Sequence, residues 1–508
     1  MKRKIMILTI AFLSSVLMCA NAFAAATGRC GNSIKWTLDD SGNLTLSGSG
    51  EMWNYDYRNP PFEGCEIKTV TIGDGITSIG DYVFKGCSGM TELTLPNSIT
   101  SIGESAFRGC SGLTKLTLPN SITSIGESAF DGCSGLTKLT LPNGVTSIGN
   151  AAFEDCSGLI ELTLPNSVTS IGNAAFYGCT GLTELILPNS VTSIGYGAFS
   201  GCSGLEKITV GRGNKRYDSW GNCNSIIETE TNTLIAGCKN SVIPNSVTSI
   251  GDGAFWGCTG LTELILPNGV TSIGKDAFSG CSGMTELTLP NSVTSIGDFA
   301  FRGCTGLTEL ILPNSVRSIG DFAFSYCSGL EKITVESGNS CYDSRDNCNS
   351  IIDTETNTLI VGCKNSVIPN SVTSIVDYAF SECSGLAKIT SLAEIPPMCG
   401  FKVFDGVNKT NCELIVPGGS VAAYTQAEVW NEFSNISGFS GVEDTVADGN
   451  TIRAIGNQIE ISGDFTSVEV YGINGALIYK GKDNVVTVPS AGIYLVHVAG
   501  KTRKIVVE

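Results

Sequence analysis

Hydrophobic and polar residues recur along most of this chain with a period of 23 positions. The unit Leu118–Thr140 reads LPNSITSIGESAFDGCSGLTKLT, and the apolar residues keep their places from copy to copy. Such a period predicts stacked coils that bury their apolar side only against neighbouring coils. We therefore expect a β-rich solenoid. The clearest copies are Leu95–Thr117, Leu118–Thr140, Leu141–Thr163, Leu164–Ile186, Leu187–Thr209, Leu266–Thr288 and Leu289–Ile311.

Each coil is expected to contain two short extended pieces separated by a turn. In a representative copy, Leu113, Leu116 and Leu118 follow the L-x-x-L-x-L pattern of a strand with one apolar face. The Pro-Asn-Ser run after Leu118 ends this strand, because proline lacks a backbone donor and asparagine favours turns. Ile122 and Ile125 then point inward from the second piece.

The rest of the coil predicts a tight return that closes the core. Gly126 breaks the second extended piece, and Glu127 begins what we expect to be a single helical turn, since an acid suits the amino end of a helix. Ala129, Phe130 and Cys133 complete the buried side, with Phe130 supplying most of the bulk. Each coil therefore has about eight positions whose side chains are expected to point inward.

Cysteine is abundant, with 21 residues, and ten of them follow the repeat. Residues on in-register coils point in the same direction, so neighbouring thiols do not face each other as a disulfide requires. We expect a column of small buried thiols. The ten positions are Cys87, Cys110, Cys133, Cys156, Cys179, Cys202, Cys258, Cys281, Cys304 and Cys327.

Two longer coils, Val210–Ile243 and Val335–Ile368, match each other and interrupt the series. Each contains two strand-like segments separated by a polar turn, which predicts a β-hairpin. If Glu228 pairs with Thr233, Cys223 lies opposite Cys238, and the second copy places Cys348 opposite Cys363. Two cross-strand disulfides are one interpretation of these positions, and plain thiols are the other.

The sequence divides into five segments. Residues 1–24 have a basic start, an apolar stretch and an Ala-Phe-Ala cleavage site, as an export signal does. Residues 25–71 predict an N-terminal β-hairpin cap, 72–390 the solenoid, and 391–440 a C-terminal cap with a helical stretch from Ser420 to Trp430. Residues 441–508 predict a small β-sandwich. Its expected strands are Gln458–Ser462, Val468–Tyr471, Ala476–Lys480, Val485–Val488, Ile493–Val498 and Thr502–Val507.

Charge and composition exclude several classes of function. The formal charge is −17, and it becomes −20 once the three basic and no acidic residues of the signal are removed. This acidity argues against nucleic-acid partners. No window of the mature chain is apolar enough to span a bilayer.

Catalytic chemistry has little support in this composition. The single histidine is His497, near the carboxyl end, so a His-containing triad and a His-rich zinc site are not available to the repeats. We expect no enzyme activity, no metal and no cofactor. A hydrolase that uses a pair of carboxylates stays as an alternative, although no two acids stand out from the repeat background.

The repeats instead present a long surface that could bind a partner. Threonine suits an exposed strand without any function, but an extended sheet of such residues can also hold an extended partner through many weak contacts. The residue after the repeat phenylalanine varies most, and aromatic residues there could anchor a partner. The candidate residues are Thr94, Thr117, Thr140, Thr163, Ile186, Ile265, Thr288, Ile311, Tyr177 and Trp256.

The order of these motifs resembles the BspA-type leucine-rich repeats of bacterial surface proteins, from about Ile34 to Phe439. The resemblance rests on the strand LTKLTLP, the VTSIG stretch and the AFxGC turn, which recur in that order. It implies a leucine-rich-repeat solenoid and adhesion to host matrix proteins or to proteins and glycans of other bacteria. A structural spacer without a specific ligand is the alternative.

The tail resembles the carboxy-terminal sorting domain of type IX secretion. The resemblance rests on Val468–Tyr471, Gly492–Val498 and Lys504–Val507, whereas the Pro-Asn-Pro-like opening common in those domains is absent from this chain. It implies a protein that is secreted, or attached to the outer surface of a Gram-negative-type envelope.

Overall fold

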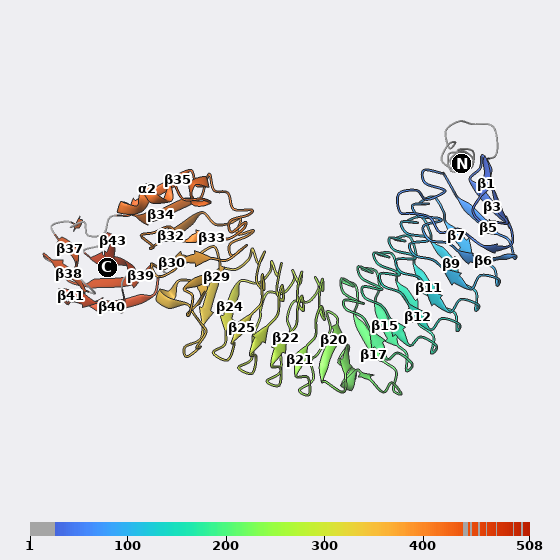
Figure 1. Ribbon diagram of the computed structural model, residues 1–508. Coiled ribbons are helices and arrows are strands. Elements are labelled where there is room, and N and C mark those ends of the chain that lie inside the picture. Colours follow the sequence, from blue (N-terminus) through green and yellow to red (C-terminus); the bar gives the residue numbers. More distant parts are fainter. Residues whose placement is uncertain are drawn as a thin grey trace, which may run out of the picture. The chain divides into compact units, whose positions relative to one another are not determined.

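The computed structural model describes residues 26–439, 445–447, 450–455, 458–463, 465–473, 475–490, 492–498 and 501–507. The predicted export signal, residues 1–24, therefore lies outside the described residues. The chain divides into two compact units, Met1–Met284 with Ile296–Phe301, and Thr285–Ser295 with Arg302–Glu508. Within each unit the predicted solenoid is present (Figure 1).

An antiparallel hairpin begins the first unit, as the sequence predicts. β2 (Ile34–Leu38) pairs with β3 (Asn43–Gly48), and β1 (Ala26–Arg29) adds a third strand. β3 then pairs in parallel with β5 (Thr69–Ile72), the first strand of the first coil. The hairpin therefore covers the apolar end that the first coil would otherwise expose to water.

Most coils contribute two short strands, which pair in parallel with corresponding strands of adjacent coils (Figure 1). Residues 23 apart are Cα partners, for example Leu139 with Leu162. The first strands are β5, β7 (Glu92–Thr94), β9 (Lys115–Thr117), β11 (Lys138–Thr140), β13 (Glu161–Thr163), β15 (Glu184–Leu187), β17 (Lys207–Val210), β24 (Glu309–Leu312) and β26 (Lys332–Val335). The second strands are β4 (Gly50–Glu51), β6 (Ile76–Ile79), β8 (Ser101–Ile102), β10 (Ser124–Ile125), β12 (Ser147–Ile148), β14 (Ser170–Ile171), β16 (Ser193–Ile194), β21 (Ser249–Ile250), β22 (Ser272–Ile273), β23 (Ser295–Ile296), β25 (Ser318–Ile319) and β31 (Ser374–Ile375).

The segment after Glu127 is not the single helical turn that the sequence predicts. The N–H groups of Ser128, Phe130 and Gly132 each donate to a carbonyl of the next coil at 2.8 Å, whereas the N–H of Asp131 donates to the Ser128 carbonyl of its own coil. This alternation requires left-handed backbone at Ser128 (φ 51°) and Gly132 (φ 70°). An α-helix would direct every backbone N–H along its own axis, to a carbonyl of the same segment. Hydrogen bonding to the next coil therefore takes the place of the predicted helical turn.

Phenylalanine forms a continuous stack in the core. Phe107, Phe130 and Phe153 are fully buried, and successive ring centroids lie 5.2 and 5.3 Å apart with interplanar angles of 6° and 3°. The same stacking runs from Phe62 to Phe199. The predicted inward residues are buried with it, except that Leu116 is only half-buried.

The two longer coils contain the predicted hairpins. In the first, β19 (Ser225–Glu228) pairs with β20 (Thr233–Gly237), and β20 pairs in parallel with β21. Gly237 lies against Phe255, where a Cβ atom would come within 2.1 Å of the ring, so only glycine fits. The hairpin elements are β18 (Tyr217–Asp218), η1 (Trp220–Asn222), β19 and β20, then β27 (Tyr342–Asp343), η2 (Arg345–Asn347), β28 (Ser350–Asp353) and β29 (Thr358–Gly362).

The solenoid segment of the second unit ends in a mixed closing segment. Trp430 is fully buried, and its indole N–H donates to the Pro397 carbonyl at 2.8 Å. The predicted helical stretch from Ser420 to Trp430 is wrong in extent, because only Val421–Tyr424 is α-helical. The elements are β30 (Val367–Ile368), β32 (Lys388–Ser391), β33 (Met398–Cys399), β34 (Glu413–Pro417), η3 (Gly418–Ser420), α2 (Val421–Tyr424), η4 (Trp430–Glu432) and β35 (Asn435–Phe439).

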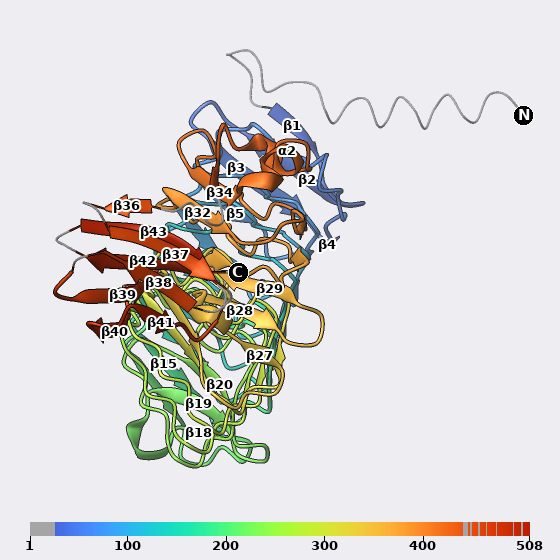
Figure 2. The same ribbon diagram turned by 90° about the vertical axis from the view of Figure 1, so that its left-hand side faces the viewer.

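The tail forms two four-stranded antiparallel sheets around their own apolar core, and its strands are grouped in Figure 2. One sheet has the order β36-β37-β38-β41 and the other β40-β39-β42-β43. The six predicted strands are present, and the structure adds β36 and β37. The strands are β36 (Thr445–Ala447), β37 (Asn450–Ile455), β38 (Gln458–Ser462), β39 (Val468–Gly472), β40 (Leu477–Gly481), β41 (Val485–Thr487), β42 (Gly492–Val498) and β43 (Lys501–Val507).

The phenylalanine stack generates a stability prediction. We expect Phe130→Ala to lower the free energy of unfolding by about 3–5 kcal/mol, because it removes a fully buried ring and leaves a cavity between two stacked neighbours. Guanidinium unfolding of the full chain measures this. Ile160, which is 50% exposed, is the control, and Ile160→Ala should change the free energy by about 0.5 kcal/mol or less. Equal effects of the two changes would contradict the stack's role.

Candidate functional site

The outward positions of the first strands lie on the surface, one per coil. Thr94 and Thr117 are Cα partners, as are Thr140 and Thr163, so the side chains of adjacent coils stand side by side. We call the eight predicted residues the strand ladder. Ile265 and Thr288 are exposed as well, although neither belongs to a regular strand. The ladder residues of the first unit are Thr94, Thr117, Thr140, Thr163, Ile186 and Ile265, and those of the second unit are Thr288 and Ile311.

The ladder threonines differ from the threonines of the second sheet in their hydrogen bonding. On the second sheet, the Thr146 hydroxyl donates to the Thr123 carbonyl at 3.1 Å, and corresponding threonines repeat this bond between coils. Within the described part of the chain, no hydrogen bond engages the hydroxyl groups of the ladder threonines. Their donors and acceptors are therefore available to a partner, together with the apolar Ile186 and Ile265, which are 55% and 74% exposed.

Charged residues beside the ladder pair with each other from coil to coil. Lys138 and Glu161, for example, form an ion pair at 2.7 Å, with both side chains more than half exposed. Exposed pairs of this kind contribute at most about 1 kcal/mol to stability. They balance the charges beside part of the ladder, whereas the flanking residues of two further coils, Glu263 and Glu286, are both acidic. The other pairs are Glu92–Lys115, Glu184–Lys207 and Glu309–Lys332.

The structure brings Tyr177 and Trp256 together, although the sequence separates them by a longer coil. Their ring centroids lie 5.1 Å apart in an edge-to-face arrangement. Tyr196 joins them, with its ring 6.1 Å from Trp256 and its hydroxyl donating to Asp276 Oδ2 at 2.6 Å. Tyr196 is not among the residues predicted from the sequence. The one sequence feature that could have indicated it is an aromatic residue at a position where other coils have a polar one.

Acidic residues lie next to this aromatic group. Asp131 is mostly buried and forms an ion pair with Arg108 at 2.9 Å. Burial raises the pKa of Asp131, although Arg108 partly opposes this. Burial also raises the pKa of Glu154, and the nearby Asp131 and Asp155 carboxylates raise it further. The carboxylates therefore share one region of the surface.

The cysteine column is buried as predicted, and its thiols are hydrogen-bonded. Cys133 Sγ donates to the Phe107 carbonyl at 3.3 Å, and Cys156 Sγ donates to the Phe130 carbonyl at 3.3 Å. Each thiol therefore gives the previous coil's phenylalanine carbonyl a second donor, beside the N–H that it accepts within its own coil. Alanine would lose both this bond and the packing of the sulfur atom, and serine would bring a more costly hydroxyl into the core.

The two hairpins do not form the disulfides considered from the sequence. Cys223, Cys238, Cys348 and Cys363 are free thiols in the structure. The assumed register is correct next to the turn, where Glu228 pairs with Thr233, but a bulge shifts it by one residue at Ile226. Cys238 then lies beside Asn224 and donates to its carbonyl at 3.5 Å. The second hairpin has the same bulge between Ile351 and Ile352.

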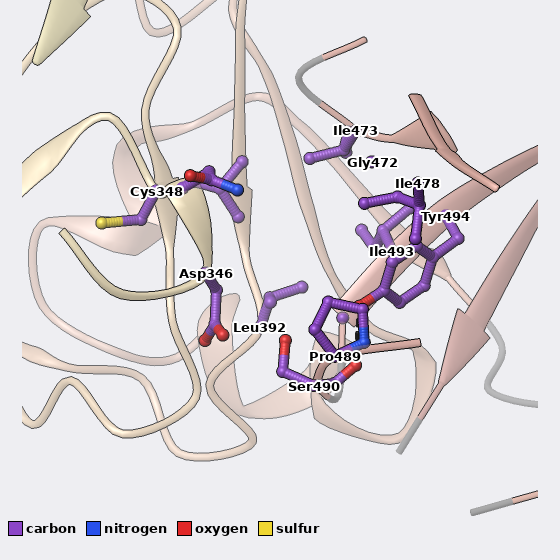
Figure 3. Close-up of a pocket in the computed structure, with 13 residues that line it drawn as sticks. Asp346, Cys348, Leu392, Gly472, Ile473, Ile478, Pro489, Ser490, Ile493 and Tyr494 are labelled. Carbon is purple, nitrogen blue, oxygen red and sulfur yellow. Dashed lines mark hydrogen bonds between the residues drawn. The ribbon is translucent and has the colours of Figure 1, made fainter. Parts of the chain in front are cut away.

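The described residues offer little to a small substrate or a metal. They contain no group of three or more His, Cys, Asp or Glu side chains that could hold a metal ion. No helix among them is both long and apolar enough to cross a membrane. A cavity of about 310 Å³ in the second unit is lined by Asp346, Cys348 and Leu392 and by the tail residues Ile478 and Tyr494, among others (Figure 3). Its lining brings no catalytic pair of carboxylates together.

Comparison with known proteins gives one family. The model of the BspA type leucine rich repeat region matches in six copies, over residues 58–157, 101–228, 235–351 and 358–424. No curated protein matches the chain significantly.

Several solved structures are similar to this chain. A leucine rich cell surface protein from Faecalibacterium prausnitzii is 28% identical, with a TM-score of 0.48 over 63% of this chain and 97% of that one. The pneumococcal vaccine antigen PcpA is 21% identical, with a TM-score of 0.48 over 84% of this chain and 100% of that one. A leucine-rich repeat protein from Eubacterium ventriosum is 22% identical, with a TM-score of 0.44 over 84% and 98%.

The buried thiols generate a prediction about pH. Burial raises the pKa of Cys156 and of Cys202 from 9.0 to about 12. Above pH 9 the unfolded chain releases these protons and the folded chain does not, so stability is full below pH 9 and is lost as the pH rises toward 12. Each such thiol should lower the free energy of unfolding by about 1.4 kcal/mol per pH unit in this range.

Guanidinium unfolding under reducing conditions between pH 8 and pH 10.5 measures the effect. The free energy of unfolding of Cys156→Ala should be lower at every pH because of lost packing. It should also fall less steeply with pH than that of the unchanged chain, and the two slopes should differ by about 1.4 kcal/mol per pH unit. Identical slopes for the two proteins would show that this thiol is not buried in the neutral form.

Proposed function

Because the chain belongs to the BspA-type leucine-rich repeat family, we propose that it is an exported binding protein of the cell surface or the surrounding medium. Its partners would be host extracellular matrix proteins, or proteins and glycans on other bacteria. The family resemblance supports this partner class, and the repeat surface supplies a suitable contact area.

The observation that carries the proposal is the free hydroxyl groups of the strand ladder. Near the second sheet, the hydroxyls of Thr100, Thr146 and Thr169 bond between coils, whereas Thr94, Thr117, Thr140 and Thr163 leave theirs to solvent. Parallel strands lie about 4.8 Å apart, so a partner placed along the ladder meets one hydroxyl or methyl group per coil. Each hydrogen bond contributes only about 0.5–1.5 kcal/mol, so affinity would come from several coils together.

Binding rather than catalysis also agrees with the chemistry of the surface. The thiols of the cysteine column, such as Cys87, Cys156 and Cys202, are buried, and burial raises their pKa values, so they make poor nucleophiles. The single histidine, His497, lies on a tail strand and contacts Thr502. A spacer without a ligand is the competing function, and it differs from our proposal in showing no saturable binding.

We also propose that the tail acts as a type IX sorting domain for a Gram-negative-type envelope. The support is its resemblance in sequence, together with a compact two-sheet tail that has its own core. A separate core allows such a module to be recognised without disturbing the solenoid.

A binding experiment tests the proposed function. We expect the purified full chain to bind immobilised extracellular matrix proteins or bacterial surface glycans saturably. Thr117→Lys with Thr140→Lys should weaken that binding at least about tenfold, because two long charged side chains would block adjacent positions of the ladder. The control is Thr123→Lys, which changes an exposed threonine of the same coil series near the second sheet. No saturable binding to any of these surfaces would favour the spacer.

A secretion experiment tests the tail. In a bacterium with type IX secretion, we expect the full chain to reach the cell surface or the medium, and a chain that ends at residue 440 to remain in the periplasm. Cell fractionation and surface proteolysis measure the difference. Ile505→Asp, which introduces a charge into the tail core, should also block export by unfolding the module. Equal export of the truncated chain would contradict the assignment.

A further inference from the structure

Three aromatic side chains of the first unit form a group that the repeat pattern does not require. Tyr177, Tyr196 and Trp256, which we call the aromatic triad, come from three different coils and contact each other through Trp256. Tyr196 is 39% exposed, and Tyr177 and Trp256 are half-buried. Exposed aromatic groups are frequent anchors for protein partners.

The triad lies next to the first longer coil, which has no AFxGC turn of its own. Because that coil replaces its AFxGC turn with a hairpin, the turns on either side of it meet directly. The Gly201 N–H donates to the Trp256 carbonyl at 2.6 Å, and the Ser200 hydroxyl donates to the Gly253 carbonyl at 3.0 Å. Ser200 and Gly253 also line a cavity of only about 10 Å³, so the two turns pack closely against each other.

The surroundings of the triad are acidic. Burial raises the pKa of Tyr177, and the nearby charges of Asp155, Glu154 and Asp276 raise it further. Asp276 also accepts the Tyr196 hydrogen bond. Four nearby carboxylates, the fourth being Asp252 beside Tyr196, therefore place negative potential around three π faces. Such surroundings favour a cation over an anion or a neutral group.

Elsewhere in the chain, comparable rings are already occupied by the chain's own cations. Lys85 Nζ lies 3.5 Å from the centroid of the Tyr57 ring. In the second unit, Arg302 lies 5.1 Å from the Tyr326 ring. Arg302 occupies the position that corresponds to Tyr177 at the second longer coil, since the two longer coils are offset by 335 − 210 = 125 residues. Among the described residues, no lysine or arginine lies over a triad ring.

We propose that the aromatic triad binds a lysine or arginine side chain of a partner protein. The partner's cation takes the place that Lys85 and Arg302 occupy at the other rings, with Glu154 and Asp155 balancing its charge. This inference rests on the proposed function and specifies the chemistry of the partner. The triad is then the point that positions a partner along the coils, and the strand ladder supplies further contacts.

The test uses the full chain labelled with 5-fluorotryptophan and a glycine-rich peptide that contains four lysines. We expect the peptide to shift the ¹⁹F resonance of Trp256, which Trp256→Phe identifies among the five tryptophans. The same peptide with norleucine in place of lysine should not shift it. Isothermal titration calorimetry, which does not depend on the Trp256 resonance, measures the Kd of the lysine peptide, and Trp256→Ala and Tyr177→Ala should each raise it about tenfold.

Two further variants test whether binding depends on the charge beside the triad and on the location of the triad, and not on a general loss of folding. Glu154→Gln preserves the shape of the side chain and should raise the Kd about threefold at low salt, because it removes one balancing charge. Tyr378→Ala changes the corresponding aromatic group of the second unit, where Tyr378 contacts Tyr326, and should leave the Kd unchanged. Equal binding of the norleucine peptide, or an unchanged Kd in Trp256→Ala, would overturn the inference.

The outcomes also separate this inference from the proposed function. If the full chain binds matrix proteins or bacterial glycans but the lysine peptide does not bind the triad, the inference fails and the function stands. If the lysine peptide binds at Trp256 but no matrix protein or cell surface is bound, the function fails and the cation site stands.

Discussion

Backbone hydrogen bonding between corresponding residues of adjacent coils is the constraint on which the rest of the solenoid depends. In the turn segment, alternate N–H groups such as those of Ser128 and Phe130 donate to the next coil instead of to their own. Coils of equal length satisfy this pattern at every turn, so the 23-residue period serves hydrogen bonding as well as packing. The phenylalanine stack and the thiol column follow, because residues in register occupy the same place in every coil.

The longer coils change this register locally. The hairpin of β19 and β20 provides a strand for β21, and Gly237 gives Phe255 the space that a further phenylalanine would otherwise fill. The surface changes more than the core does. Turns from non-consecutive coils meet at the junction, and side chains that the period keeps apart become neighbours there. Irregularity in a periodic protein therefore creates the distinctive surface, and the aromatic triad is its result in the first unit.

Two kinds of surface result from the same repeat. The strand ladder is uniform, neutral and rich in free hydroxyl groups, which suits many weak contacts with an extended partner. The triad is singular, aromatic and surrounded by carboxylates, which suits one specific cationic side chain. A uniform surface alone would not specify a position along the coils, because neighbouring coils look alike. A single distinctive group can provide that register.

The sequence by itself determined the solenoid, the inward residues and the exposed ladder, because a strict period assigns each residue the same surroundings as its counterparts. It also placed both hairpins, whose turns are local. Tertiary structure decided the rest. Hydrogen bonds between coils replaced the helical turn expected at Glu127, and a bulge at Ile226 separated Cys223 from Cys238. Tyr177 and Trp256 are in contact because the longer coil between them has a hairpin in place of an AFxGC turn, so the turns on either side meet. No local sequence pattern predicts this contact.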